Sequence, residues 1–316
     1  MRGSAIDQIP PWGWIALGVL VLILLAIDLL AHRGQRAGSR RNAITWSAIW
    51  IGAGLLVNVF VWGVFGGQAA YEYLAAYLIE KSLSLDNLFV FLIVFQSLDI
   101  PQQHQHRVLF WGIFGALVFR GLFIFVGTAA LERWEWITYV FGAILFYAAY
   151  RTFREDPAKQ EGNKTVAWLS KHLPLTKDAR GRAFIAQEDG RRVATPLLVA
   201  LIAIELTDIL FAIDSVPAAF SVSRSPFIVY SSNVFAILGL RALYVVLAHT
   251  IAELKYLHYG LAGVLGFAGV KLIIDQWVHL PPLVSIGIIV AVLGTAVWVS
   301  LRERRREPAD DRHLST

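Results

Sequence analysis

Long apolar stretches separated by short polar segments run through almost the whole chain. A transmembrane helix needs about 20 mostly apolar residues to cross about 30 Å of hydrocarbon. The first apolar stretch exceeds a signal-peptide core and precedes its basic residues, so we expect it to be retained. We predict an all-α polytopic membrane protein with about nine spans, at residues 12–31, 43–64, 73–98, 108–130, 135–153, 195–221, 228–250, 257–275 and 281–301.

Lysine and arginine are distributed unevenly between the two sides of these spans. One side holds 21 of the 28 basic residues, the other holds three, and the rest lie inside spans. Because cytoplasmic loops are enriched in such residues, we place the N-terminus outside and the C-terminus in the cytoplasm. The chain then divides into helices 1–5 (1–153), a basic cytoplasmic loop (154–194), helices 6–9 (195–301) and a cytoplasmic tail (302–316).

The basic loop contains several prolines and glycines and ten basic residues in the wider segment. Residues 182–193 predict a small β-hairpin that turns at Asp189-Gly190. The simpler interpretation of the loop is a solvated linker. A regulatory or partner-binding role is the alternative.

The composition supports a membrane protein and excludes several other classes. Hydrophobic residues make up 57% of the chain, charged residues 16%, and the mean hydropathy is +0.58, against about 45–50% and 25% in soluble domains. A soluble enzyme, a disordered protein and a nucleic-acid-binding module are thereby excluded. The chain has no cysteine and one methionine, which excludes disulfide scaffolds and thiolate or thioether metal sites.

Helices 3–5 resemble helices 6–8. Residues 85–89 match 213–217, and Asp86 and Asp214 each follow an acid, Glu80 or Asp208, by six residues. An offset of three spans inverts the second unit, and inverted repeats are typical of secondary transporters with a midplane site. Chance similarity among apolar helices is the alternative. Each unit also carries an arginine in the middle of its second helix, Arg120 and Arg241.

Five carboxylates fall inside predicted spans. An acid at a helix centre costs about 2.5–3.5 kcal/mol, so five unpaired ones would cost on the order of 10–15 kcal/mol. They must therefore pair, bind protons, reach water or hold a cation. Three bases in the spans can compensate charge or gate the site. Five acids against three bases leave two negative charges, which matches one divalent cation. Internal salt bridging alone is the alternative. The acids are Glu80, Asp86, Glu205, Asp208 and Asp214, and the bases are Lys81, Arg120 and Arg241.

The candidate ligands are hard oxygen donors. Carboxylates, hydroxyls and the amides of Asn87 or Asn233 suit Mg²⁺, Mn²⁺ or Ca²⁺. Five of the eight histidines lie at or near predicted span ends on the cytoplasmic side, so we interpret them as interfacial: His32, His104, His106, His249 and His258. Without histidine or cysteine at the midplane, Zn²⁺ and Cu⁺ are disfavoured.

Helices 73–98 and 195–221 are expected to be broken or bent near the midplane. Acids six residues apart lie about 240° apart on a straight helix, so one face cannot present both. Pro217 removes a backbone hydrogen bond close to Asp214. Two straight helices whose carboxylates face different neighbours are the alternative.

The segments Glu80–Asn87 and Glu205–Pro217 resemble the two signature segments of the TerC/Alx family of integral membrane proteins, and the likeness extends over about residues 40–303. The resemblance implies export of a divalent metal, above all Mn²⁺, across the bacterial inner membrane. It does not imply direct tellurite chemistry, since the chain has no thiol.

No nucleotide-binding motif is visible, so we expect a secondary transporter, with protons as the coupling ion. The expected partners are the lipid bilayer, the divalent ion and protons, without nucleic acid or a permanently bound cofactor. The alternative is a membrane partner that supports metalation or folding of exported proteins, or envelope and tellurite stress resistance. An intramembrane enzyme is a third interpretation that the repeat and arginines disfavour.

Overall fold

The computed structural model describes residues 11–31, 40–154, 157–172, 183–188, 191–248, 256–275, 277–278 and 280–304. Side chains are described for these residues except at 28–31, 40–41, 85–86, 157–164, 188, 191, 247–248, 257 and 304.

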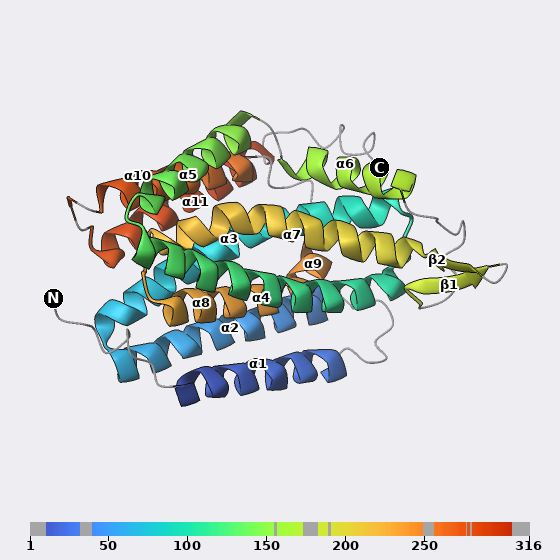
Figure 1. Cartoon of the computed structure of the whole chain (residues 1–316), viewed down its shortest axis with the longest axis horizontal. Helices are drawn as coiled ribbons and strands as arrows, with labels where there is room; N and C mark the ends of the chain where they lie inside the picture. Colours follow the sequence, from blue (N-terminus) through green and yellow to red (C-terminus); the bar gives the residue numbers. More distant parts are fainter. Residues whose placement is uncertain are drawn as a thin grey trace.

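The described chain is almost entirely helical, which confirms an all-α membrane protein. Each predicted span coincides with a helix, or in one case with a pair of helices (Figure 1). The elements are α1 (Pro11–Ala31), α2 (Arg40–Phe65), α3 (Gly67–Ser97), α4 (Gln102–Arg133), α5 (Ile137–Arg154), α6 (Pro157–His172), β1 (Ile185–Glu188), β2 (Arg191–Ala194), α7 (Pro196–Phe220), α8 (Pro226–Leu238), α9 (Leu240–Ala248), α10 (Leu257–Ile274) and α11 (Pro282–Arg304).

Five helical stretches of the described chain are long and apolar enough to cross a membrane. They belong to α2, α4, α7, α8 with α9, and α11. The 31-residue α3 is too charged to count, because every 18-residue stretch of it contains at least three charged residues. Two shorter apolar segments lie in α1 and α10, so the total of nine spans stays a prediction.

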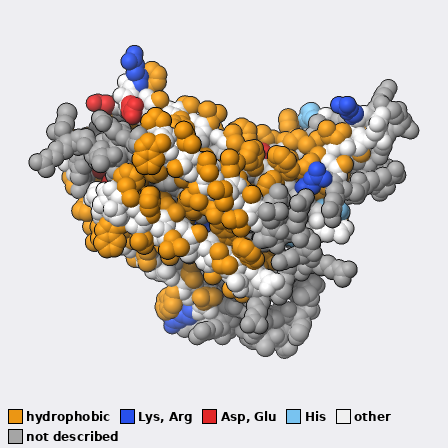
Figure 2. All heavy atoms as spheres, turned by 90° about the horizontal axis from the view of Figure 1, so that it is seen from below, with side chains coloured by type: hydrophobic (Ala, Val, Ile, Leu, Met, Phe, Trp, Pro, Cys, Tyr) orange, Lys and Arg blue, Asp and Glu red, His pale blue; other side chains and the backbone are white. Residues whose placement is uncertain are grey.

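The outer surface of the molecule is apolar. In Figure 2 hydrophobic side chains cover most of the described face, and coloured charged groups lie toward its edges. Soluble monomers rarely expose an apolar patch larger than a few hundred Å². Five of the exposed tryptophans lie near helix ends on the side away from the β-hairpin, as expected at a lipid–water boundary. They are Trp12, Trp62, Trp134, Trp136 and Trp277.

Helices α3 and α7 form the centre of the bundle. Helix α3 packs on α8, α4 packs on α7, and α5 packs on α10. This reciprocal packing is what an inverted repeat of helices 3–5 and 6–8 would produce, although the repeat itself stays a prediction. Gly66 alone joins α2 to α3 and has a φ of 88°, which glycine adopts without strain.

The expected break in the two acid-bearing helices is wrong, because both α3 and α7 are continuous. A bend in either helix stays a prediction. Pro217 lies only three residues before the end of α7, so few backbone hydrogen bonds depend on it. The helix that divides is 226–248, which breaks at Gly239 into α8 and α9. There Lys81 Nζ donates to the Ala236 carbonyl at 3.0 Å, so a lysine satisfies an acceptor near the end of α8.

Gly239 occupies a position with no room for a side chain. A Cβ added there would lie 2.9 Å from Trp50 Cβ and 3.1 Å from Lys81 Nζ. We expect Gly239→Ala to destabilise the fold by about 1–3 kcal/mol, because overpacking forces neighbours to shift. Thermal unfolding in detergent measures this. Gly287→Ala, on an open face of α11, is the matched control, and equal unfolding temperatures for the two variants would contradict the prediction.

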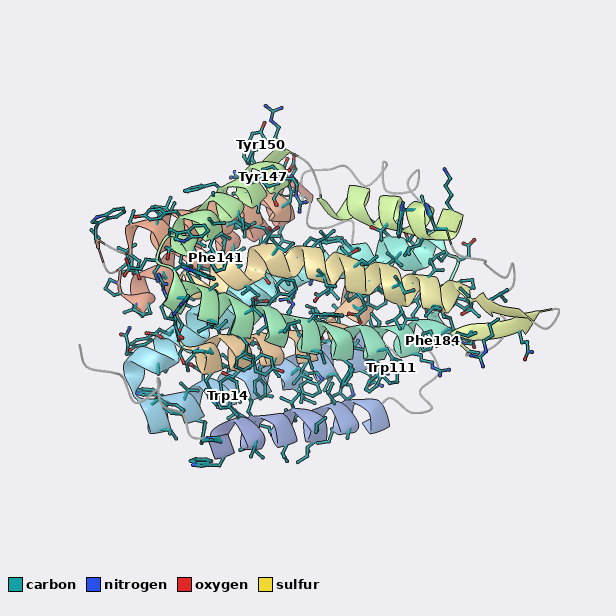
Figure 3. All side chains as sticks on the ribbon, viewed as in Figure 1. Trp14, Trp111, Phe141, Tyr147, Tyr150 and Phe184 are labelled. Atoms are coloured by element: carbon teal, nitrogen blue, oxygen red, sulfur yellow. The ribbon has the colours of Figure 1, made fainter. Side chains whose placement is uncertain are left out.

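The two strands of the predicted hairpin are confirmed, whereas its predicted turn at Asp189-Gly190 lies outside the described residues. A helix beside the hairpin was not foreseen. Strands β1 and β2 are antiparallel, with Glu188 opposite Arg191. Helix α6 precedes them and packs against α3 and α7. Figure 3 shows Phe184 at the base of the hairpin, and the Arg107 guanidinium lies 4.9 Å from the centre of its ring. The described part of the basic loop is therefore folded against the helices.

Candidate ion-binding site

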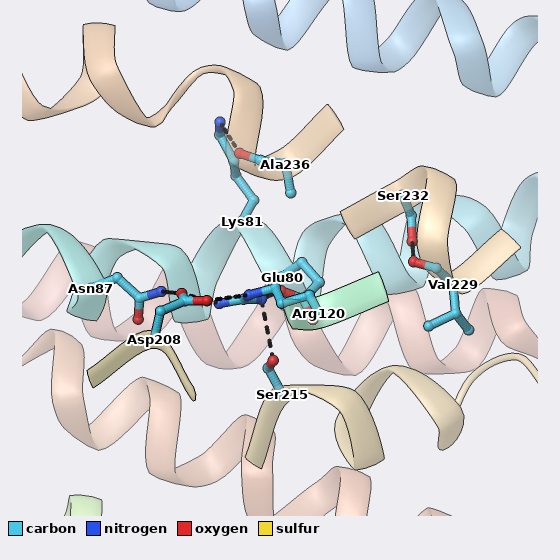
Figure 4. Close-up of polar contacts among 9 residues, drawn as sticks. All are labelled: Glu80, Lys81, Asn87, Arg120, Asp208, Ser215, Val229, Ser232 and Ala236. Atoms are coloured by element: carbon cyan, nitrogen blue, oxygen red, sulfur yellow. Dashed lines mark hydrogen bonds and ion pairs between the residues drawn. The ribbon is translucent and has the colours of Figure 1, made fainter. Parts of the chain in front are cut away.

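Arg120 is the centre of a buried ion-pair network. Its side chain on α4 is 1% exposed, and one Nη binds the Glu80 carboxylate of α3. The other Nη lies 3.1 Å from Asp208 Oδ1, and Nε lies 3.3 Å from Asp208 Oδ2. One guanidinium thus joins α3 to α7 (Figure 4).

Two further polar groups complete this network. Arg120 donates to Ser215 Oγ at 3.2 Å, and Asn87 Nδ2 donates to Asp208 Oδ1 at 3.1 Å. Asp208 and Glu80 are 4% and 0% exposed. Two carboxylates and one guanidinium give a formal charge of −1 when both acids are ionised. Since removing one partner of a buried ion pair is strongly destabilising, the network holds the centre of the bundle together.

Small residues on α4 let it approach α7 closely enough for this contact. A Cβ at Gly112 would lie 3.1 Å from Ile204. A Cβ at Gly115 would meet the Glu205 carboxylate directly. Glycine at these positions therefore brings the backbones together and leaves space for the Glu205 side chain.

Several oxygens beside the network lack a hydrogen-bond partner within the described part of the chain. Glu80 Oε1, Ser84 Oγ and Asn87 Oδ1 are buried on α3, and both amide atoms of Asn233 are buried on α8. Asn233 approaches the Glu80 carboxylate without forming a hydrogen bond of normal geometry. Buried polar atoms without partners are uncommon and call for an explanation. Carboxylate, amide and hydroxyl oxygens are the donors that hard divalent cations prefer.

A small cavity lies beside Arg120. It has a volume of about 20 Å³, and Asn87, Arg120, Ser215 and Asp214 are among its lining residues. Asp214 Oδ2 lies 3.7 Å from an Nη atom of Arg151, and both side chains are partly exposed. Arg151 falls inside the predicted span 135–153 but was counted among the ten basic residues of the wider loop segment. It in fact pairs with one of the five candidate acids, and its place within one turn of the end of α5 is the signal that would have indicated this.

The structure brings some of the predicted site residues together and separates others. Glu80, Asn87, Arg120 and Asp208 are in contact, and Asn233 lies beside them. Among the described side chains, no three His, Asp or Glu residues are close enough to hold a metal ion. The remaining positions are Asp214 at the cavity, Glu205 beside Gly115, Lys81 bound to a carbonyl, Arg241 buried at the start of α9, and Asp86, whose side chain lies outside the described residues.

The described histidines do not contribute to this network. His104 and His106 lie in the first turns of α4, and His258 lies at the start of α10. His32 and His249 lie outside the described residues. The helix-end positions of the first three agree with the interfacial interpretation.

The profile described as "Integral membrane protein TerC family" matches residues 65–308. The chain belongs to the TerC family. Relatives match it along nearly their whole length. "Uncharacterized membrane protein STKORF319" of Myxococcus xanthus is 42% identical over 304 residues, which cover 95% of each chain. "Putative membrane-bound redox modulator Alx" of Escherichia coli K12 is 39% identical over 312 residues, covering 94% of this chain and 97% of the relative.

A further relative in Rickettsia bellii, "Uncharacterized membrane protein", is 34% identical over 291 residues. No solved structure matches the chain. Membership of the TerC family confirms the resemblance that the two signature segments suggested, and both segments fall inside the matched range.

Proposed function

We propose that this TerC family protein exports a divalent cation, Mn²⁺ above all, in exchange for protons. Glu80 and Asp208 form the core of the site. The observation that carries the proposal is that two buried carboxylates on different helices share one arginine, among oxygens without partners. A purely structural ion pair does not require those additional hard donors.

Arg120 acts in this proposal as an internal competitor for the metal ion. A guanidinium and a divalent cation cannot both take the same carboxylate oxygens. Arg120 and Asp214 both line the small cavity. In this proposal the guanidinium moves toward Asp214 when the metal ion binds. Binding of the metal and release of the arginine are then alternative states of one site, as exchange transport requires.

Export against the membrane potential needs a coupling ion. Each unit charge moved outward costs about 2.3 kcal/mol per 100 mV, so a divalent ion costs about twice that. Carboxylates can bind either a proton or a cation, and inward proton flow supplies the energy. The bacterial relatives support a location in the inner membrane. The basic residues on the side of the molecule that carries the hairpin support a cytoplasmic C-terminus.

A flux measurement tests the proposed exchange. Purified protein in liposomes is expected to take up Mn²⁺ faster when the lumen is more acidic than the medium, because outward proton flow then drives uptake. Asp214→Asn is expected to slow this uptake, since it removes an acid from the cavity. Glu132→Gln, an exposed acid at the end of α4, is the matched control. A rate of Mn²⁺ uptake that does not depend on the pH gradient and is unchanged in Asp214→Asn would contradict the proposal.

A second candidate function is a partner role in envelope stress. Relatives carry the name "membrane-bound redox modulator", although this chain has no cysteine with which to exchange disulfides itself. The hairpin and α6 expose apolar side chains, Ile185 and Trp168, which favour a protein contact. A deletion strain that regains stress resistance from an Asp208→Asn protein without regaining metal export would support this role over transport.

A further inference from the structure

A file of buried polar side chains runs along one face of α3. Tyr73, Tyr77, Glu80, Ser84 and Asn87 are spaced four, three, four and three residues apart, so they share one side of the helix. Each has a buried oxygen without a hydrogen-bond partner in the described part of the chain. The file runs from residue 73 to residue 87, a rise of about 21 Å along the helix axis. Its middle member is the carboxylate that Arg120 binds.

The tyrosine half of the file is tightly packed. Tyr73 and Tyr77 are 0% and 3% exposed, and their rings stack with centroids 6.2 Å apart. A Cβ at Gly54 of α2 would lie 2.7 Å from the Tyr77 ring, so α2 closes over it. Asn58, one turn further along α2, adds another buried oxygen without a partner. Buried, stacked rings of this kind disfavour the passage of a divalent ion with its water shell.

A carboxylate lies beside the file near the end of the molecule opposite the hairpin. Glu72 is the residue next to Tyr73, about 100° around the helix from it. Its Oε2 accepts a hydrogen bond from Ser223 at 2.7 Å, and its Oε1 accepts one from Gln68 at 2.9 Å. The tyrosine hydroxyls are not hydrogen-bonded to one another or to Glu80, so a continuous connection between Glu72 and Glu80 requires bridging water.

In the predicted repeat, helix α7 has an acid where helix α3 has a tyrosine. Glu205 precedes Asp208 by three residues, just as Tyr77 precedes Glu80 by three. Glu205 lies nearer the hairpin end of α7 and beside Gly115, where a cation is attracted by its charge. The two routes to the central carboxylates therefore differ in chemistry: an acid on one side and tyrosine hydroxyls on the other.

We propose that Tyr73 and Tyr77 form a proton path between Glu72 and Glu80, separate from the route of the metal ion. A proton binds to one hydroxyl oxygen as that hydroxyl gives its own proton, through a bridging water, to the next oxygen. Each O–H bond that breaks is replaced, so the tyrosines end unchanged and one proton reaches Glu80. This path rests on the proposed proton exchange.

The test separates proton-coupled uptake from metal exchange. In liposomes, uptake of Mn²⁺ driven by a pH gradient needs net proton movement, whereas exchange of radioactive for unlabelled Mn²⁺ at equal pH does not. The Tyr73→Phe/Tyr77→Phe double variant removes only two oxygens. We expect it to lower gradient-driven uptake about tenfold or more, as loss of a proton-transfer group does, and to leave exchange unchanged. Tyr230→Phe on α8, outside the file, is the matched control.

Other results would overturn the path. Wild-type gradient-driven uptake in the double variant would show that the hydroxyls carry no protons. Loss of both activities from protein that still elutes as a single species in detergent would place the metal ion itself on this route. If the wild-type protein moves no Mn²⁺, the proposed function fails. The proton path is then tested by measuring the proton leak through the protein under a membrane potential. A leak that the double variant abolishes supports the path, and equal leaks overturn it.

Discussion

Arg120→Met is expected to destabilise the protein by about 3–5 kcal/mol, the cost of removing one partner from a buried ion pair. The substitution keeps most of the side-chain volume but leaves Glu80 and Asp208 buried without their shared guanidinium. Thermal unfolding in detergent, followed by tryptophan fluorescence, measures the loss. Yield of monodisperse protein is a second readout if the variant unfolds during purification.

Two further variants separate charge from packing. The triple variant Glu80→Gln/Arg120→Met/Asp208→Asn removes all three charges together and is expected to regain most of the lost stability, because no unpaired charge stays buried. Arg120→Lys is expected to be intermediate, since a single ammonium group cannot reproduce the fork that contacts both acids. An Arg120→Met protein as stable as the wild type would contradict this account of the network.

The helices and the paired charges could be predicted from the sequence because both signals are strong in the membrane. Apolar runs of about 20 residues have few other interpretations. An arginine and acids in such runs must compensate one another, which the contacts of Arg120 confirm. The hairpin was predictable from Asp189-Gly190, since that pair is the commonest signature of a two-residue turn.

The break at Gly239 could not be predicted in the same way. A lone glycine in an apolar helix has no distinctive pattern, and its role depends on Trp50 and Lys81 from other helices. Pro217 gave a misleading signal because its effect depends on where the helix ends. Helix α6 was missed because its apolar positions, which include Val166 and Leu169, are few.

The choice of partners was also beyond the sequence. The sequence shows which acids and bases lie within the spans, but not that Arg151 faces Asp214 while Lys81 binds a carbonyl. The polar file on α3 is different, because its spacing of four and three residues is visible in the sequence. What the sequence lacks is the burial of Tyr73 and Tyr77, which distinguishes a path from an exposed polar stripe.

Asp208→Asn is expected to reduce Mn²⁺ affinity by at least about 100-fold, since even residues that only orient metal ligands contribute 10- to 100-fold. Asparagine matches the volume of aspartate and keeps an acceptor for Arg120, so the fold is expected to survive. Titration calorimetry measures binding and liposome flux measures transport, with Glu132→Gln as the control.

A comparison with Asp214→Asn sharpens this prediction. Asp214 is partly exposed and already paired with Arg151, so its loss is expected to cost less affinity than the loss of Asp208. If Asp208→Asn binds Mn²⁺ as tightly as the wild type, the Arg120 network is structural and the ion binds elsewhere. If both variants lose binding equally, the cavity beside Arg120 and the carboxylates it bridges act as one site, and the metal reaches Asp214 as well as Asp208.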